Sequence, residues 1–284
     1  MKQSGIQTTL LTTLTMIAFA SNSLLNRLAL GQKTIDATSY TTIRLISGAI
    51  MLSLIASSQR KSGQPLLGGS WLSALFLFLY ALAFSFAYLS LSAGTGALIL
   101  FGSVQLTMII VAIRSGERPQ LLEWLGLCLA FGGLIYLVLP GLSAPPLLGS
   151  TLMLIAGIAW GIYTLRGRGS QNPLADSTGN FVYAVPMIVL IRLISVNNIH
   201  LSVAGFLFAT LSGALASGVG YVIWYSALRG LTTTRAAIIQ LSVPVLAAWG
   251  GVLFLSEHIS ARLLFAGIFI LGGIALTVLS RNKS

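Results

Sequence analysis

Long stretches of this sequence contain no charged side chain, and this feature limits the folds open to the chain more than any other. No Asp, Glu, Lys or Arg occurs in residues 62–113 or in residues 124–165. A helix that crosses a bilayer needs about 20 apolar residues, so each stretch is long enough for two crossings and a short turn. Only 7% of all residues are charged, against about 25% in soluble domains. The pattern indicates a membrane protein.

Ten apolar segments, bounded by glycine, proline or charged residues, divide the chain. They cover residues 6–30, 38–57, 70–91, 94–113, 121–139, 147–165, 178–196, 203–228, 232–255 and 263–280. The period-two alternation that a membrane β-barrel requires is absent. We therefore predict an all-α membrane protein with ten transmembrane helices. Ala18-Phe19-Ala20 resembles a signal-peptide cleavage site, but the apolar run continues to Leu30, so we expect the first helix to be retained.

The positive charges are distributed as topology signals. The net charge is +11, but the cations stand singly at segment ends, which argues against a nucleic-acid partner. With a cytoplasmic N-terminus, eleven Lys and Arg residues lie on the cytoplasmic side, four lie on the other side, and Arg44 lies within the second helix. The eleven are Lys2, Arg60, Lys61, Arg114, Arg118, Arg166, Arg168, Arg229, Arg235, Arg281 and Lys283, and the four are Arg27, Lys33, Arg192 and Arg262. This bias predicts an inner-membrane protein with both termini in the cytoplasm.

The two halves of the chain repeat each other at a spacing of about 140 residues. Glu117 and Glu257 are each followed fifteen residues later by a glycine pair, Gly132-Gly133 and Gly272-Gly273. Each half, residues 1–140 and 147–284, contains five of the expected helices. Because five is an odd number, the second copy enters the membrane from the opposite side. The repeat predicts two inverted halves, with a solute site near mid-membrane between them.

Several of these motifs resemble the EamA repeat of the drug/metabolite transporter superfamily. The resemblance is carried by residues 232–244, by the segment from Leu253 to Glu257, by Gly272-Gly273 and by Ile158-Ala159-Trp160-Gly161, and it extends over the whole chain twice. Arg44 in the second helix also matches the pattern of the family. The resemblance implies a secondary transporter with ten helices in two inverted five-helix repeats.

Polar side chains inside the apolar segments are candidates for a solute site, because such residues usually face a cavity or another helix. Asn22 lies on the first helix, Gln105 lies about 18 Å into the fourth, and Gln240 lies less deeply in the ninth. Each has the alternative role of a hydrogen bond between helices. Arg44 is the only cation well inside a segment, and it either snorkels and serves structure or anchors an anionic substrate group.

Aromatic residues complete the candidate site. Tyr80 on the third helix and Trp160 and Tyr163 on the sixth can present ring faces to an apolar, aromatic or cationic solute. The repeat places Phe19 opposite Trp160 and Asn22 opposite Tyr163. The candidate substrate-binding residues are therefore Asn22, Arg44, Tyr80, Gln105, Trp160, Tyr163 and Gln240. The glycine pairs are expected to pack helices closely, with a hinge as the alternative.

The expected function is export of small metabolites, amino acids or amphipathic compounds, by alternating access. The rival interpretations are a passive channel or facilitator and a membrane-embedded enzyme that modifies lipid. The sequence has no Walker A, H-E-x-x-H or Cys/His cluster and no carboxylate at mid-membrane depth, so we expect neither an enzyme nor a metal or cofactor. The expected partners are a small-molecule substrate and the lipid bilayer, with a homodimer as an open alternative.

Overall fold

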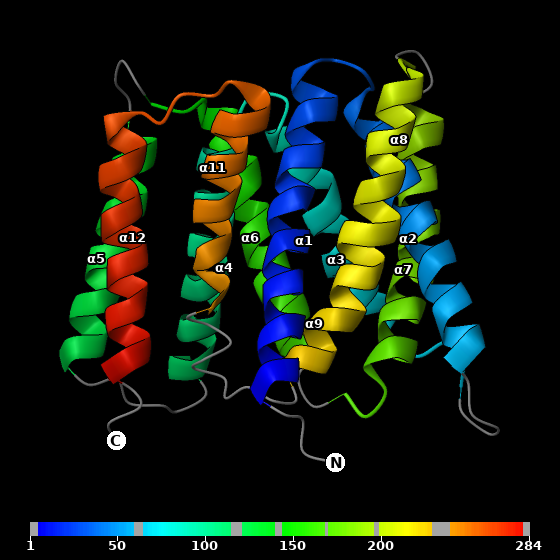
Figure 1. The fold of residues 1–284 in the computed structure, drawn as a ribbon, viewed down its shortest axis with the longest axis horizontal. Helices are drawn as coiled ribbons and strands as arrows, with labels where there is room; N and C mark the ends of the chain where they lie inside the picture. Colours follow the sequence, from blue (N-terminus) through cyan, green and yellow to red (C-terminus); the bar gives the residue numbers. More distant parts are fainter. Residues whose placement is uncertain are drawn as a thin grey trace.

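The computed structural model describes residues 5–59, 65–114, 121–139, 144–167, 170–195, 199–228 and 239–280. Within these ranges the chain forms helices joined by short connections. The helices are α1 Gly5–Gly31, α2 Ala37–Gln59, α3 Trp71–Ala87, α4 Ala93–Arg114, α5 Leu121–Val138, α6 Leu147–Gly167, α7 Pro173–Ile194, α8 Val203–Leu211, the π-helix η2 Ser212–Val219, α9 Gly220–Leu228, α11 Ser242–Leu255 and α12 Ala261–Ser280. They stand side by side, and α1 begins at the same end of the bundle at which α12 ends (Figure 1).

Each expected apolar segment contains a helix in the described part of the chain, which confirms the all-α prediction. Six helices are long and apolar enough to cross a membrane: Ile6–Gly31, Ala37–Gln59, Ala93–Val111, Leu147–Gly167, Pro173–Ile194 and Val203–Trp224. Four further apolar helices are shorter: Trp71–Ala87, Trp124–Val138, Ser242–Leu255 and Ala261–Leu276. On length and composition the described residues therefore support six crossings, and the number ten stays a prediction.

Two expected segments differ from the observed helices in physically informative ways. The helix expected at 178–196 begins at Pro173, because the Asn172 side chain accepts a hydrogen bond from the Ala175 backbone N–H at 3.2 Å and caps the helix. The segment 203–228 forms one continuous rod, α8–η2–α9, but its central turns are a π-helix. Hydropathy alone predicts neither the Asn172 cap nor the π-helical turns. In the expected segment 232–255, residues 232–238 lie outside the described residues.

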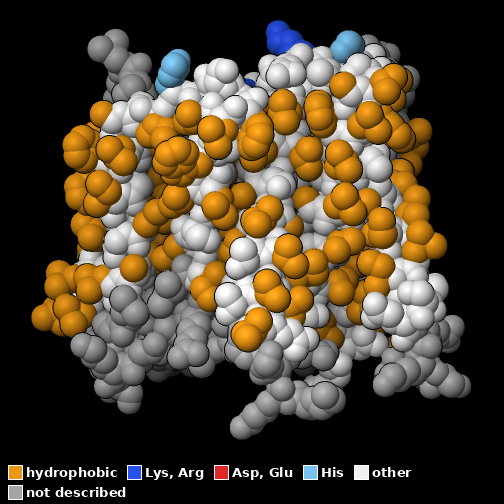
Figure 2. All heavy atoms as spheres, in the orientation of Figure 1, with side chains coloured by type: hydrophobic (Ala, Val, Ile, Leu, Met, Phe, Trp, Pro, Cys, Tyr) orange, Lys and Arg blue, Asp and Glu red, His pale blue; other side chains and the backbone are white. Residues whose placement is uncertain are grey.

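The bundle has an apolar exterior and a partly polar interior, as expected in lipid. On α1, large apolar side chains such as Ile6 and Leu10 are exposed, at 77% and 60%. The buried face of the same helix carries Thr12, Thr15 and Asn26. Figure 2 shows hydrophobic side chains spread over the middle of this face of the molecule, with the visible Lys, Arg and His side chains at its upper edge. Lipid replaces water as the outer solvent, so the usual amphipathic pattern is reversed.

The helix directions support an inverted relation between the halves. Arg27, close to the C-terminal end of α1, donates to the carbonyl of Tyr88 just after α3, at 3.4 Å, so these two helices end at the same side. Arg166, at the end of α6, donates to Ser73 at the start of α3, at 3.0 Å, so α6 runs against α3. The first helices of the two halves, α1 and α6, therefore run in opposite directions, as Figure 1 shows.

Two aspartates separated by the repeat spacing fasten loops at opposite ends of the bundle. Asp36 caps α2 by accepting from the Ser39 backbone N–H at 2.8 Å, and its other oxygen accepts from the His200 N–H at 3.1 Å. Asp176, in the first turn of α7, accepts from the Gly69 N–H at 2.8 Å. In each half, the second helix thus holds the segment that precedes the third helix of the other half. The pairing follows directly from the inverted repeat.

The expected role of the glycine pairs is confirmed for one member of each pair. Helices α5 and α12 pack along one another. A Cβ on Gly273 would lie 2.5 Å from the carbonyl oxygen of Gly126, and one on Gly133 would lie 2.8 Å from a side chain of α12. By contrast, no described atom outside the helix's own nearby backbone lies within 4 Å of a Cβ placed on Gly132 or Gly272. The expectation that these two also pack is wrong, because successive helix residues face different sides.

We expect Gly273→Ala to lower the free energy of unfolding by about 1–3 kcal/mol, because the added methyl group meets backbone atoms of α5 that cannot rotate away. Gly272→Ala is the matched control and should be neutral or slightly stabilising, since alanine is the better helix former. Thermal unfolding in detergent measures both. Equal shifts in the two variants would contradict the packing described above.

We expect Asp36 to make stability depend on pH. Burial raises the pKa of Asp36, but hydrogen bonds from Ser39 and His200 and the charge of Arg192 outweigh it, so its pKa lies below the ordinary value. A lowered folded-state pKa stabilises the protein above the unfolded pKa of about 3.9, and this stability is lost as pH falls through the folded-state value. Asp36→Asn should therefore lower the unfolding free energy at pH 7 by about 0.3–1 kcal/mol. Unfolding curves of variant and parent should converge at acid pH, and a constant difference would refute the assignment.

Candidate functional site

A small cavity lies between the two halves, at the level of the middle turns of their helices. The first half contributes α1, α3 and α4, and the second half contributes α6 and α9. The lining residues are Phe19, Asn22, Ser23, Tyr80, Phe84, Leu100, Phe101, Trp160 and Tyr221. The space open to the centre of a water molecule is about 10 Å³, which is room for about one water. The structure therefore shows the site closed around its own side chains.

Aromatic rings form the wall of this cavity, with Trp160 at their centre. The Trp160 ring lies 4.8 Å from that of Tyr80 and 4.9 Å from that of Tyr221, between centroids. Phe19 lies 6.2 Å from Trp160 with the two rings nearly perpendicular, at 86°. This contact agrees with the repeat-based expectation that Phe19 and Trp160 face each other. Such edge-to-face pairs add about 0.5–1.5 kcal/mol to the burial of each ring.

A fully buried arginine contacts the aromatic wall. Arg44, on α2, is 1% exposed, and its Nη2 donates to the Tyr80 hydroxyl at 3.0 Å. Its Nε and Nη2 also donate to the Ser217 hydroxyl, at 3.3 and 3.2 Å. The guanidinium carbon lies 5.2 Å from the ring centroids of both Tyr80 and Phe84. Arg44 therefore contacts two of the lining residues, Tyr80 and Phe84, and its burial shows that it does not snorkel to the membrane surface.

The π-helix η2 supplies the serines of this network. In a π-helix the backbone hydrogen bonds join residues five apart, and Ser212 and Ser217 are separated by five positions. Ser217 accepts from Arg44, while Ser212 donates to the Oδ1 of Asn22. Asn22 in turn donates to the Tyr80 hydroxyl at 3.4 Å. The wide turn thus joins α1, α2 and α3 of the first half to one helix of the second.

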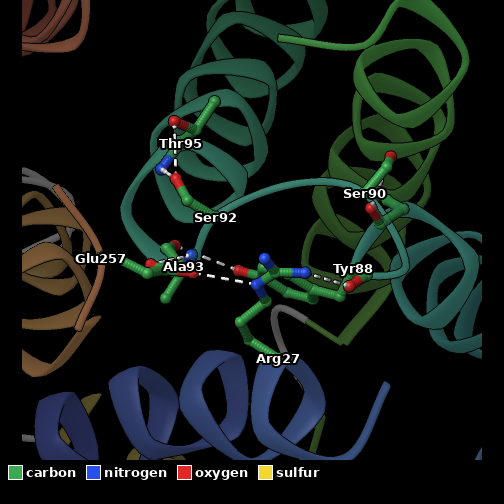
Figure 3. A network of polar contacts seen from close by, with 8 residues as sticks. Arg27, Tyr88, Ser90, Ser92, Ala93, Thr95 and Glu257 are labelled. Carbon is green, nitrogen blue, oxygen red and sulfur yellow. Dashed lines mark hydrogen bonds and ion pairs between the residues drawn. The ribbon is translucent and has the colours of Figure 1, made fainter. Parts of the chain in front are cut away.

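A second polar network joins helices at one end of the bundle (Figure 3). Arg27 Nε donates to Glu257 Oε1 at 2.9 Å, and their side chains are 26% and 13% exposed. Glu257 Oε2 accepts from the Ala93 backbone N–H at 2.8 Å, at the positive N-terminus of α4. Together with the bond from Arg27 to the Tyr88 carbonyl, these contacts join α1, α3 and α4 to the loop between α11 and α12. Glu117, the repeat equivalent of Glu257, lies outside the described residues.

The structure brings some of the predicted site residues together and leaves others apart. Asn22, Tyr80 and Trp160 line the cavity, and Arg44 contacts it through Tyr80. Tyr163 lies behind Trp160, 5.4 Å between ring centroids, with its hydroxyl accepting from Asn180 at 3.5 Å. The other two predicted residues, Gln105 and Gln240, are buried but are not among the residues that line this cavity.

Sequence reasoning did not identify the role of the two serines or of Phe101. In the sequence, the small residues Gly213 and Ser217, four positions apart, indicate only close helix packing. Gly213 fits that interpretation, because a Cβ on it would collide with the backbone carbonyl of Arg44. The available signal was the pair Ser212 and Ser217 inside an otherwise apolar segment, but serine spacing alone does not reveal a π-turn.

Comparison with known proteins defines the class of this chain. The model of the EamA-like transporter family matches residues 7–139 and again residues 147–279. The two matches cover both halves of the bundle described above. The chain therefore belongs to the EamA-like transporter family, and it is a membrane-spanning transporter of the drug/metabolite transporter superfamily.

Individual relatives agree with this assignment. The uncharacterized protein PA1977 of Pseudomonas aeruginosa is 53% identical over 275 residues, which cover 97% of this chain and 96% of the relative. The threonine/homoserine exporter RhtA of Escherichia coli K12 is 31% identical over 185 residues, covering 62% of this chain and 61% of the relative. A solved crystal structure superimposes with a TM-score of 0.66 at 19% identity, over 95% of this chain and 97% of the other, and supports the fold.

We expect Glu257→Gln to open the end of the bundle at which Arg27 lies. Glutamine can still accept from Ala93, so the variant removes the charge but keeps the helix cap. An ion pair of this partial exposure is worth about 1 kcal/mol, which corresponds to a roughly five-fold change in an opening equilibrium. In a Cys128→Ser background, Ser23→Cys places a thiol in the cavity. In the orientation that the Lys and Arg distribution predicts, this end faces the outside, and labelling of the thiol by a membrane-impermeant reagent in intact cells should become about five-fold faster.

The control for this measurement is Lys33→Gln, which removes an exposed cation from the loop after α1. It should leave the labelling rate of the cavity thiol unchanged. If Glu257→Gln and Lys33→Gln label at the same rate, the ion pair does not hold this end closed.

Proposed function

We propose that this protein is a secondary transporter that exports small metabolites, amino acids or related amphipathic compounds, across the inner membrane. In this proposal all ten apolar helices cross the bilayer and both termini are cytoplasmic. The two inverted halves rock against each other and expose the central cavity alternately to the two sides.

The observation that carries the proposal is the closed cavity between the halves. Its aromatic walls suit the apolar part of a solute, while Asn22 and Tyr80 offer neutral hydrogen-bonding groups. Mixed pockets of this kind suit amphipathic small molecules. Residues of both halves line the cavity, so a relative movement of the halves changes its volume and its access.

The direction of transport is supported by relatives. One of them, 31% identical, is named a threonine/homoserine exporter. The Lys and Arg asymmetry supports the orientation of the chain. The ion pair of Arg27 with Glu257 then lies at the non-cytoplasmic end, where it closes the cavity to the outside.

Flux measurements in proteoliposomes test the proposal. Vesicles that contain the purified protein should exchange radiolabelled L-threonine or L-phenylalanine with saturable kinetics. Trp160→Ala removes the central ring of the wall and should raise the apparent KM at least about five-fold, which corresponds to about 1 kcal/mol of lost ring contact.

Phe265→Ala is the matched control, because Phe265 is an aromatic residue of α12 that is 51% exposed on the outside of the bundle. It should leave KM unchanged at equal protein content. Flux that rises linearly with concentration would favour the channel or facilitator. Absence of flux for both amino acids would overturn the amino-acid assignment, and equal kinetics in both variants would place the site elsewhere.

A further inference from the structure

Arg44 is a buried cation, and no acidic side chain among the described residues neutralises its charge. The chain has five acidic residues, Asp36, Glu117, Glu123, Asp176 and Glu257. Asp36 lies eight residues before Arg44, about 12 Å along the helix, and binds Ser39 and His200. Asp176 and Glu257 are held by other partners near helix ends. Glu117 and the Glu123 side chain lie outside the described residues. Arg44 therefore has no carboxylate partner among the described side chains.

This arrangement is costly for an arginine and needs a reason. The guanidinium group stays protonated in proteins, so Arg44 cannot relieve the cost of burial by losing its charge. Its hydrogen-bond partners, the hydroxyls of Tyr80 and Ser217, are neutral. Its Nη1 is buried and has no hydrogen-bond partner among the residues that the structure describes. The rings of Tyr80 and Phe84 offer cation–π contacts, which offset part of the cost. Among the described side chains, Arg44 lacks a negatively charged partner that would compensate the rest of this cost.

Some of the buried polar groups that lack a close partner lie at the cavity. Besides Arg44 Nη1, the hydroxyls of Ser23 and Tyr221 are buried and make no close hydrogen bond to a described residue, although Tyr88 lies near the first and Tyr80 near the second; both residues line the cavity. Tyr80, which also lines it, links Arg44 to Asn22 through its hydroxyl. Natural proteins leave few buried polar atoms unpaired, and such atoms call for a specific explanation. Two lining hydroxyls without a close partner, together with the unpaired Nη1 of an arginine that contacts the lining, indicate a ligand that supplies oxygen acceptors.

We propose that Arg44 is the carboxylate-binding residue of the solute site, with the Ser23 and Tyr221 hydroxyls as further donors to the bound group. A carboxylate carries one negative charge and so matches a single arginine, whereas a phosphate monoester carries nearly two at neutral pH. The apolar remainder of the solute packs against Phe19 and Trp160. The inference rests on the proposed function, because it takes the cavity to be the solute site.

The same geometry makes an amino group dispensable for binding. The lining residues include no acidic side chain that would pair with an ammonium group. The carboxylate is therefore the only charged group of the solute that we expect to meet an opposite charge at the site. This separates the proposal from a general amino-acid pocket, in which both charged groups would be required.

Three probes that differ in one group each test the proposal on the purified wild-type protein. L-Phenylalanine has both groups, phenylpropionate lacks the amine, and L-phenylalanine amide lacks the carboxylate. Ligand-dependent thermal stabilisation gives the three dissociation constants. We expect the two acids to bind within about five-fold of each other and the amide at least about 30-fold more weakly, since an unpaired buried charge costs about 2 kcal/mol or more. Equal binding of acid and amide, or no binding of either acid, overturns the proposal.

Variants assign the preference to the residue. Arg44→Gln should abolish the preference for the acid over the amide, Arg44→Lys should retain part of it, and Arg262→Gln, which removes a cation at the start of α12, should leave it intact. An unchanged preference in Arg44→Gln overturns the assignment. Where Arg44→Gln does not fold, the comparison of acid with amide on the wild type still decides.

Failure of this inference is distinguishable from failure of the proposed function. Saturable flux of L-phenylalanine together with equal binding of its amide rejects carboxylate binding by Arg44 but is consistent with the proposed transport function. Preferential binding of acids without flux in any vesicle rejects the proposed export of these solutes and retains the anion site.

Discussion

The structure depends on one constraint: inside a bilayer, no water is available to satisfy backbone N–H and C=O groups. Helices satisfy these groups internally, and the described chain is helical wherever its sequence is long and apolar. The connections remain at the ends of the bundle, where polar side chains can serve them. Asp36 and Asp176 do so at opposite ends, each by accepting hydrogen bonds from a loop of the other half.

A second consequence is that burial cannot hold these helices together by itself, because lipid is as apolar as leucine. Close approach of small residues and polar contacts between helices take over this role. Gly273 allows α5 and α12 to touch at the backbone. At the centre, Ser212 and Ser217 reach from the π-turn to Asn22 and Arg44. The polar contacts that position the site are thus also contacts that hold the two halves together.

The sequence predicted the helices and the inverted repeat better than it predicted the site. The scarcity of charged residues is a property of whole segments, so it predicts helices independently of how the side chains pack. Site residues depend on which face of a helix points inward, and this is set by neighbours far apart in sequence. Trp160 lines the cavity as expected, whereas Gln105, at similar depth, does not line it. Arg44 was singled out as a lone cation, but its partner Ser217 could not be found without the π-turn that turns it inward.

The position of Arg44 also bears on how movement and solute are linked. With no carboxylate among the lining residues, a proton relay through the described cavity has no acidic group to use. Under the proposed function, the empty site closes by stacking Tyr80 and Phe84 on the arginine. A bound carboxylate would replace this partial compensation by a full opposite charge. The loaded site is then close to neutral, and a neutral site is less costly to close off from water than an unpaired cation. A ligand shifts the equilibrium between the inward-open and outward-open states only if it binds the conformations along the way with different affinity. The charge of the solute would provide this difference, because it stabilises the closed conformation through which the two halves exchange their contacts.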